Sequence, residues 1–165
     1  MMQSNPPFPR QTKTMMTRFI CALLALAAAA FAAPGDAPVA FAVGQQWSYP
    51  TRKSEPDSQL VILRIDDHAK LGRVVHVGVL GAKFRLEPGQ PPVPWNIGHM
   101  PFPEAVLRKN VNQLALAHSD AVFPDFESSY AGWKVEADAG KKQFWTTSVA
   151  NAIDGLETML RRGRK

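Results

Sequence analysis

Carboxylates and an imidazole cluster at one place in this chain, the tripeptide Asp66-Asp67-His68. A metal ion needs three or four ligands that converge on it. Adjacent residues of an extended strand point to opposite sides, so these three side chains cannot all face one ion. We therefore interpret the tripeptide as part of a hairpin turn over residues 66–72, where Asp and Gly suit turn geometry, and predict no metal site.

Two further histidines could take part in acid/base chemistry. His76 lies in a run of valines that predicts a strand, with its side chain on the face opposite Val75 and Val77. It could face a pocket as an acid or base, or it could be a half-exposed histidine on the outer face of the sheet, the interpretation that we favour. A hydrolase would pair His76 or His99 with Asp67.

No other motif identifies a reaction. The sequence contains no Gly-x-Ser-x-Gly elbow, His-Glu-x-x-His helix, phosphate-binding loop or dinucleotide fingerprint. The single cysteine, Cys21, lies in an N-terminal apolar run, so the chain after that run has no thiol nucleophile. The sequence thus favours a protein that is not an enzyme, with no catalytic residues and no cofactor.

The most unusual segment after the N-terminal region is 87–103, which holds six prolines in 17 residues. Long connections of this kind are often binding loops, and proline keeps them extended. Tryptophan and methionine are enriched in interfaces. We predict a partner-binding loop whose contact residues are Trp95, His99, Met100 and Phe102. The alternative is that the loop covers an open edge of the sheet of its own domain.

Alternating apolar residues predict strands at 46–51 and 73–80, and a run of branched apolar residues predicts a strand at 59–65 that is covered on both faces. A short fourth strand is expected at 83–86. Consecutive strands with short connections pair as an antiparallel meander. We expect an SH3-like half-barrel or a curled sheet of three or four strands.

Helices are predicted after the meander, at 103–115, 125–139 and 148–160, with one more strand at 143–147. The fold class is therefore α+β, with two to three helices. In the second helix an aromatic stripe could be a ligand platform, but its spacing is also that of a buried helix face, which we favour: Phe126, Tyr130 and Trp133.

The apolar run at 19–33 follows Arg18 and resembles the centre of a secretory signal peptide. As a helix it would span about 22 Å, less than the ~30 Å of a bilayer core, so an uncleaved anchor is the less favoured alternative. Residues 1–14 form a doubtful extension, with initiation at Met15 or Met16, and 15–32 the signal. Cleavage is expected after Ala32, with Ala42 as the second choice.

The mature protein is accordingly predicted to be periplasmic or secreted, with no stable membrane anchor. Its expected parts are a flexible lead-in at 33–44, one domain at 45–160 and a basic tail at 161–165. Residues 34–160 carry 12 basic and 14 acidic side chains, a net charge of −2, although the whole chain has +5. Because a nucleic-acid-binding domain carries its basic patch on the folded body, we predict no nucleic-acid partner.

The string GQQWSYPTRKSEPDSQLVILRIDDHAKLGRVVHVGVLG, followed by IGHMPF, resembles a group of small bacterial proteins of no known function. The resemblance covers roughly residues 43–160. It implies a module that stands alone, and it carries no activity, cofactor or site residue.

Together these observations predict an exported, non-enzymatic domain that binds another protein, in an inhibitor- or immunity-like role, through the segment 87–103. Two alternatives remain open: a small periplasmic hydrolase, and a protein that binds a small ligand in the mouth of the curled sheet. An enzyme needs a histidine and a carboxylate within hydrogen-bond reach in a concave pocket. A binding module should show an exposed apolar patch and no perturbed titratable pair.

Overall fold

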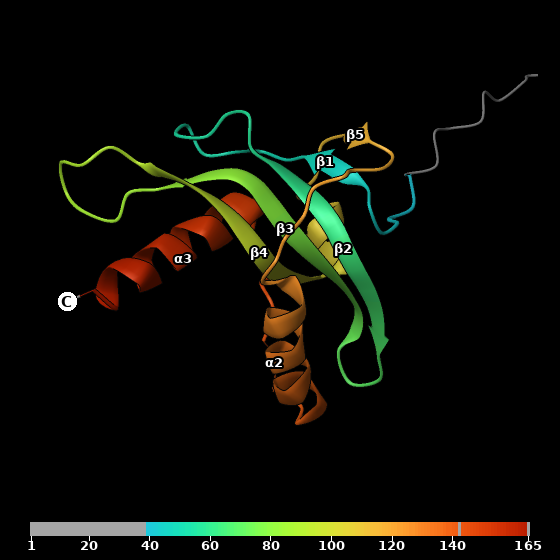
Figure 1. The fold of residues 1–165 in the computed structure, drawn as a ribbon. Coiled ribbons are helices and arrows are strands. Elements are labelled where there is room, and N and C mark those ends of the chain that lie inside the picture. The colour runs from blue at the N-terminus through green and yellow to red at the C-terminus, as the bar shows by residue number, and fades with distance from the viewer. Residues whose placement is uncertain (1–38, 142, 165) are drawn as a thin grey trace, which may run out of the picture. The chain divides into compact units, whose positions relative to one another are not determined.

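The fold was analysed in a computed structural model, which describes residues 39–141 and 143–164 (Figure 1). The predicted extension at 1–14, the predicted signal peptide at 15–32 and the first part of the predicted lead-in lie outside the described residues. In the part of the chain that the structure describes, none of the helices has the length and apolar character needed to cross a membrane.

A five-stranded antiparallel sheet forms the centre of the fold, in the order β4-β3-β2-β1-β5. Its strands are β1 (Gln46–Ser48), β2 (Gln59–His68), β3 (Gly72–Phe84), β4 (Val93–Pro103) and β5 (Leu114–Leu116). The predicted α+β class and antiparallel meander are confirmed. The strand count is higher than expected, and the sheet is not closed, so the half-barrel is not confirmed.

Within residues 39–141 and 143–164, three helices accompany the sheet: α1 (Glu104–Arg108), α2 (Phe126–Asp138) and α3 (Val149–Arg162). The first is much shorter than the helix predicted at 103–115, because the chain leaves it to pair β5 with β1. The strand predicted at 143–147 does not form. The last helix includes Arg161 and Arg162, which were expected to belong to a tail.

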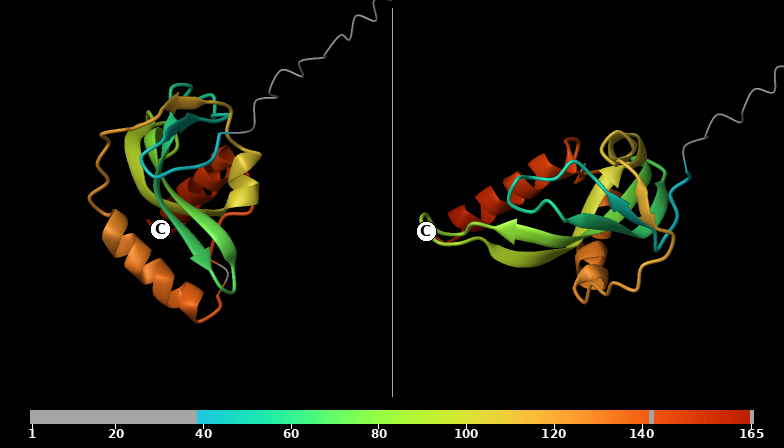
Figure 2. Two further views of the ribbon diagram at one scale, coloured as in Figure 1. Left: turned by 90° about the vertical axis from the view of Figure 1, so that its right-hand side faces the viewer. Right: turned by 90° about the horizontal axis from the view of Figure 1, so that it is seen from above.

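The helices cover both faces of the sheet (Figure 2). On one face, Val75, Val77 and Val79 pack with residues of α1 and α3 in an apolar core. On the other face, Val61 and Val74 pack under α2. The predicted aromatic stripe of α2 is buried there, which confirms that it is a packed helix face.

A bulge in β2 decides which side chains lie under α2. Ile62 pairs with Val77, whereas Arg64 pairs with His76, so β2 contains one extra residue between these two pairs. A bulge of this kind re-aims the side chains beyond it. Strict alternation would place Arg64 and Asp66 on the face of Ile62, and the bulge moves both to the face of α2.

The segment 87–103 is not a loop throughout, because β4 begins at Val93. Proline is tolerated in this strand since β4 is an edge strand, where one side of the backbone has no ladder partner. Met100 and Phe102 have no exposed surface and belong to the apolar core, so these two side chains cannot meet a partner. Strand β4 has a bulge between Ile97 and Met100, which places the side chains of Ile97 and Met100 on the same, apolar face of the sheet.

Phe41 shows that the end of the predicted flexible lead-in is packed. Its side chain is buried against Trp47, with ring centroids 5.3 Å apart. The guanidinium of Arg108 lies 3.6 Å from the Phe41 ring centroid and donates a hydrogen bond to the carbonyl of Val39. The folded unit therefore begins before residue 45.

Candidate ligand-binding site

Two histidines meet on the face of the sheet that α2 covers. His76 of β3 is fully buried and His99 of β4 is half-buried. Nδ1 of His76 lies 2.8 Å from Nε2 of His99. The ring planes are 17° apart and the centroids 5.1 Å apart, so the imidazoles lie edge to edge in nearly one plane. This is the arrangement of an N–H···N hydrogen bond.

Asp66 of β2 lies at the other edge of His76. Its Oδ2 is 3.4 Å from Nε2 of His76 and accepts a 2.7 Å hydrogen bond from the Tyr130 hydroxyl. Its Oδ1 accepts a 3.0 Å hydrogen bond from Nε of Arg64. A chain of polar groups thus runs from Arg64 and Tyr130 through Asp66 and His76 to His99.

Aromatic side chains of α2 enclose this chain of polar groups. The ring of Trp133 stands edge-on to His76, with centroids 4.5 Å apart, and Tyr130 does the same at 5.2 Å. Phe126 lies 5.7 Å from His99. The cover removes water from the imidazoles and strengthens the electrostatic interactions among them.

This environment sets the charge of each group at neutral pH. Burial, with the neighbouring His99, lowers the pKa of His76 to about 4, and burial lowers the pKa of His99 to about 4. Partial burial opposes ionisation of Asp66, but hydrogen bonds from Tyr130 and Arg64 bring its pKa below the usual value. Burial and the bond to Asp66 raise the pKa of Tyr130 to about 12. At pH 7 the site therefore holds two neutral imidazoles and one carboxylate.

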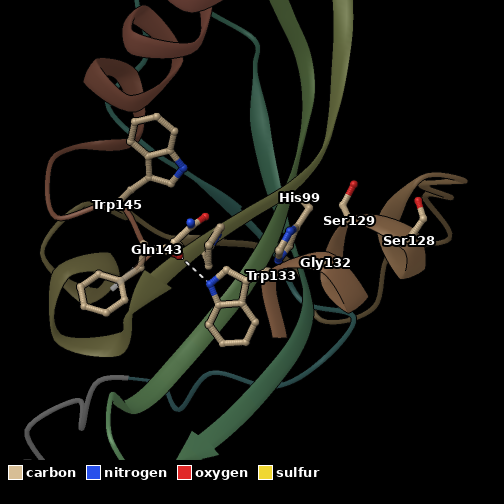
Figure 3. Close-up of a pocket in the computed structure, with 9 residues that line it drawn as sticks. His99, Ser128, Ser129, Gly132, Trp133, Gln143 and Trp145 are labelled. Carbon is tan, nitrogen blue, oxygen red and sulfur yellow. Dashed lines mark hydrogen bonds between the residues drawn. The ribbon is translucent and has the colours of Figure 1, made fainter. Parts of the chain in front are cut away.

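A pocket of about 520 Å³ opens beside His99 (Figure 3). One wall comes from α2 and includes Gly132 and Trp133, and the opposite wall comes from the segment that leads into α3 and includes Trp145. The indole N–H of Trp133 donates to the carbonyl of Gln143 and so ties the two walls together. The remaining lining residues are Pro101, Ser128, Ser129, Gln143 and Phe144.

Gly132 opens the pocket on the side of α2. A Cβ atom at this position would meet no atom within 4 Å. Glycine inside a helix costs about 1 kcal/mol relative to alanine. The absence of a side chain at this position leaves the pocket open on the side of α2.

The predicted contact residues do not form one surface. Trp95 is 47% exposed near the start of β4, whereas Met100 and Phe102 lie in the core. His99 lines the pocket on the face of the sheet opposite to that core. Trp95 and His99 therefore serve different surfaces.

The carboxylate expected beside the histidines was assigned to the wrong residue. Asp67 is largely exposed and lies 3.7 Å from Arg73, while its neighbour Asp66 meets His76. Asp66, Asp67 and His68 are the last residues of β2 and not a turn, because the connection to β3 is confined to residues 69–71. His76 is not half-exposed, because α2 covers it.

Two serines, Ser128 and Ser129, line the pocket together with His99. The hydroxyl of Ser128 donates to the carbonyl of Asp125, and no hydroxyl is hydrogen-bonded to His99 among residues 39–141 and 143–164. The same residues contain no group of three side chains that could hold a metal ion. His76 and Asp66 lie 3.4 Å apart beside the pocket, which is the pair of groups that acid/base chemistry requires.

Comparison with known proteins adds no family or neighbour: no family model, curated protein or solved structure matches this chain. The resemblance to a group of small bacterial proteins accordingly stays a prediction.

Proposed function

We propose that this protein binds a small, uncharged organic molecule in the pocket beside His99. The observation that carries the proposal is the combination of an aromatic-walled pocket of about 520 Å³ with the half-buried imidazole of His99 at its wall. Ligand sites typically combine apolar and aromatic walls with a few fixed polar groups. The perturbed pKa values of His76 and His99 add support, since such shifts concentrate at functional sites.

The lining suggests a ligand with a flat ring. Trp133, Phe144 and Trp145 offer aromatic surfaces for stacking, and no charged side chain lines the pocket among the described residues. An ionic ligand would lose its hydration without gaining an opposite charge, which makes its binding costly.

Filling the pocket from α2 tests the proposal. A leucine side chain at Gly132 would occupy the open space beside the helix, so Gly132→Leu should abolish saturable binding of 2-naphthol while the protein stays folded. Ala131→Leu is the matched control, because Ala131 is an exposed neighbour on α2 that does not line the pocket. Binding is measured by isothermal titration calorimetry and folding by thermal unfolding. Equal binding by wild type and Gly132→Leu would contradict a ligand site here.

A second candidate function is protein binding at the start of β4. Val93 and Trp95 are about half exposed, at 46% and 47%, on an edge strand that follows a Pro-rich turn. Aromatic anchors of this kind dominate many interfaces. Trp95→Ala should leave thermal unfolding nearly unchanged and abolish capture of a partner from periplasmic extract, with Val135→Ala of α2 as the control. Retention of every captured protein by the Trp95 variant would contradict this function.

We also propose export, on the basis of the sequence pattern at 15–32. Cleavage after Ala42 would remove Phe41, a core side chain, whereas cleavage after Ala32 retains it. The packing of Phe41 thus supports the earlier site. N-terminal sequencing of the periplasmic protein should begin at Ala33, and a start at Val43 would contradict the argument.

A further inference from the structure

The chain from Asp66 to His99 determines where each imidazole proton lies. A carboxylate only accepts hydrogen bonds, and Oδ2 of Asp66 faces Nε2 of His76 at 3.4 Å. This Nε2 is the one buried side-chain polar atom without a hydrogen-bond partner among the described residues. A lone pair there would face the negative charge of Asp66. The proton of neutral His76 is therefore on Nε2.

The position of the proton on His76 determines which way the hydrogen bond between His76 and His99 runs. Neutral His76 with its proton on Nε2 has a lone pair on Nδ1. The 2.8 Å contact to Nε2 of His99 is then a hydrogen bond that His99 donates. Neutral His99, with its proton on Nε2, has a lone pair on Nδ1.

His99 lines the pocket, and Nδ1 is the ring nitrogen that remains for a ligand. We propose that this nitrogen is a fixed hydrogen-bond acceptor and that the pocket selects a neutral ring carrying a hydroxyl or N–H donor, such as a phenol. This inference rests on the proposed ligand-binding function and narrows its ligand class. A carboxylate ligand would place its oxygens against the lone pair of Nδ1, which disfavours it.

Three ligands of nearly equal shape separate the possibilities in the wild-type protein: 2-naphthol, 2-methoxynaphthalene and 2-naphthoate. One additional hydrogen bond contributes about tenfold in affinity. We expect 2-naphthol to bind about tenfold more tightly than 2-methoxynaphthalene at pH 7, and 2-naphthoate to bind more weakly than both. Equal affinity for naphthol and its methyl ether would overturn the donor selectivity and leave the ligand pocket in place. Failure of all three to bind would overturn both.

The Asp66→Asn variant should lose the preference for 2-naphthol over 2-methoxynaphthalene. Arg64 donates to Oδ1 of Asp66 and the Tyr130 hydroxyl donates to Oδ2. With the amide oxygen kept at Arg64, the NH₂ group takes the Oδ2 position, where the Tyr130 hydroxyl turns to accept from it and the NH₂ group also faces His76. His76 must then accept at Nε2 and donate from Nδ1, which moves the proton of His99 to Nδ1. The methyl ether, which only accepts, should now bind at least as tightly as 2-naphthol.

His99→Phe completes the experiment, because it removes the acceptor and keeps an aromatic ring at the pocket wall. In this variant naphthol and methoxynaphthalene should bind equally. Thermal unfolding of each variant establishes whether it is folded. If Asp66→Asn does not fold, the affinities of the wild-type protein for the three ligands still test the proposal. A naphthol preference that persists in folded His99→Phe would overturn the assignment of His99 as the acceptor.

Discussion

The two faces of the sheet are both covered by helices, yet they bury different chemistry. Under α1 and α3 the core is apolar, and its largest fully buried side chains include Phe84 and Phe102. Under α2 the core contains His76 and the edge of Asp66. The first core gains its stability mainly from apolar burial, whereas the second must satisfy polar groups within it as well.

The polar groups near α3 also differ from those under α2, because they are charged and paired with opposite charges. Glu55 is fully buried but bonds to the Arg52 guanidinium and to the amide N–H of Lys83. Arg52 also reaches Asp154 and Glu157 on α3. There, opposite charges satisfy one another and attach a helix to the sheet. Under α2, the imidazoles of His76 and His99 contact each other, and His99 lines the pocket in which we propose that a ligand binds.

The largest expected effect belongs to the apolar face. Phe102→Ala should lower the free energy of unfolding by about 4 kcal/mol, because it removes a fully buried ring and leaves a cavity. Val93→Ala, on the exposed part of the same strand, should cost less than about 0.5 kcal/mol. Urea unfolding of both variants checks this. Similar values for the two would mean that the face under α3 is not a packed core.

The buried histidine under α2 should make the free energy of unfolding depend on pH. In the unfolded chain the histidine pKa is about 6.5, whereas the folded pKa of His76 is about 4. Between these values the unfolded state binds more protons, so stability is complete near pH 7 and falls as the pH drops toward 4. The loss from His76 should be about 3 kcal/mol.

Urea unfolding at pH 7 and pH 4.5 measures this loss. The carboxyl of Asp66 has a lowered pKa, so its contribution is lost below this range and does not interfere. His76→Phe should reduce the pH dependence and leave a remainder that His99, whose pKa is also lowered to about 4, carries. His118→Gln, at an exposed residue outside the cluster, should retain the full dependence. An unchanged pH dependence in His76→Phe would contradict the role of this imidazole.

A smaller effect should come from the contact between the sheet and the segment before α2. A Cβ at Gly78 would lie 2.5 Å from the ring of Phe123, so Gly78→Ala must displace that ring. Overpacking of this kind costs about 2 kcal/mol. Differential scanning calorimetry would detect the loss, and an unchanged melting temperature would mean that Phe123 does not pack on this face.

The smallest effect should have the opposite sign. Gly132→Ala adds a Cβ that meets no atom and removes the flexibility of glycine from the interior of α2. We expect the free energy of unfolding, measured by thermal unfolding, to rise by about 0.5–1 kcal/mol. A loss of stability would show that the pocket side of α2 is more crowded than the geometry indicates.

Local patterns were enough to predict much of the fold. Runs of branched apolar residues identified β2 and β3, and helical spacing identified α2 with its buried Tyr130 and Trp133. The strand β4 was missed because its prolines argue against a strand, and only its position at the sheet edge makes them acceptable.

The site was harder to predict, because it depends on register. Alternation along β2 would have placed Arg64 and Asp66 on the apolar face, and the bulge that moves them to the face of His76 has no clear sequence signal. His99 joins His76 only because β4 pairs with β3. The sequence did indicate that one face of β2 changes from apolar to polar along the strand, because every second residue from position 64 is polar: Arg64, Asp66 and His68.

We propose that the two histidines under α2 are an ordered pair of neutral imidazoles and that His99 presents an acceptor to the pocket. Nitrogen-15 NMR of histidine-labelled protein at pH 7 can establish this, because the ring nitrogen shifts report both charge and tautomer. We expect two neutral rings, each protonated at Nε2, for His76 and His99. A proton on Nδ1 of His99, or a positive charge on either ring, would contradict it.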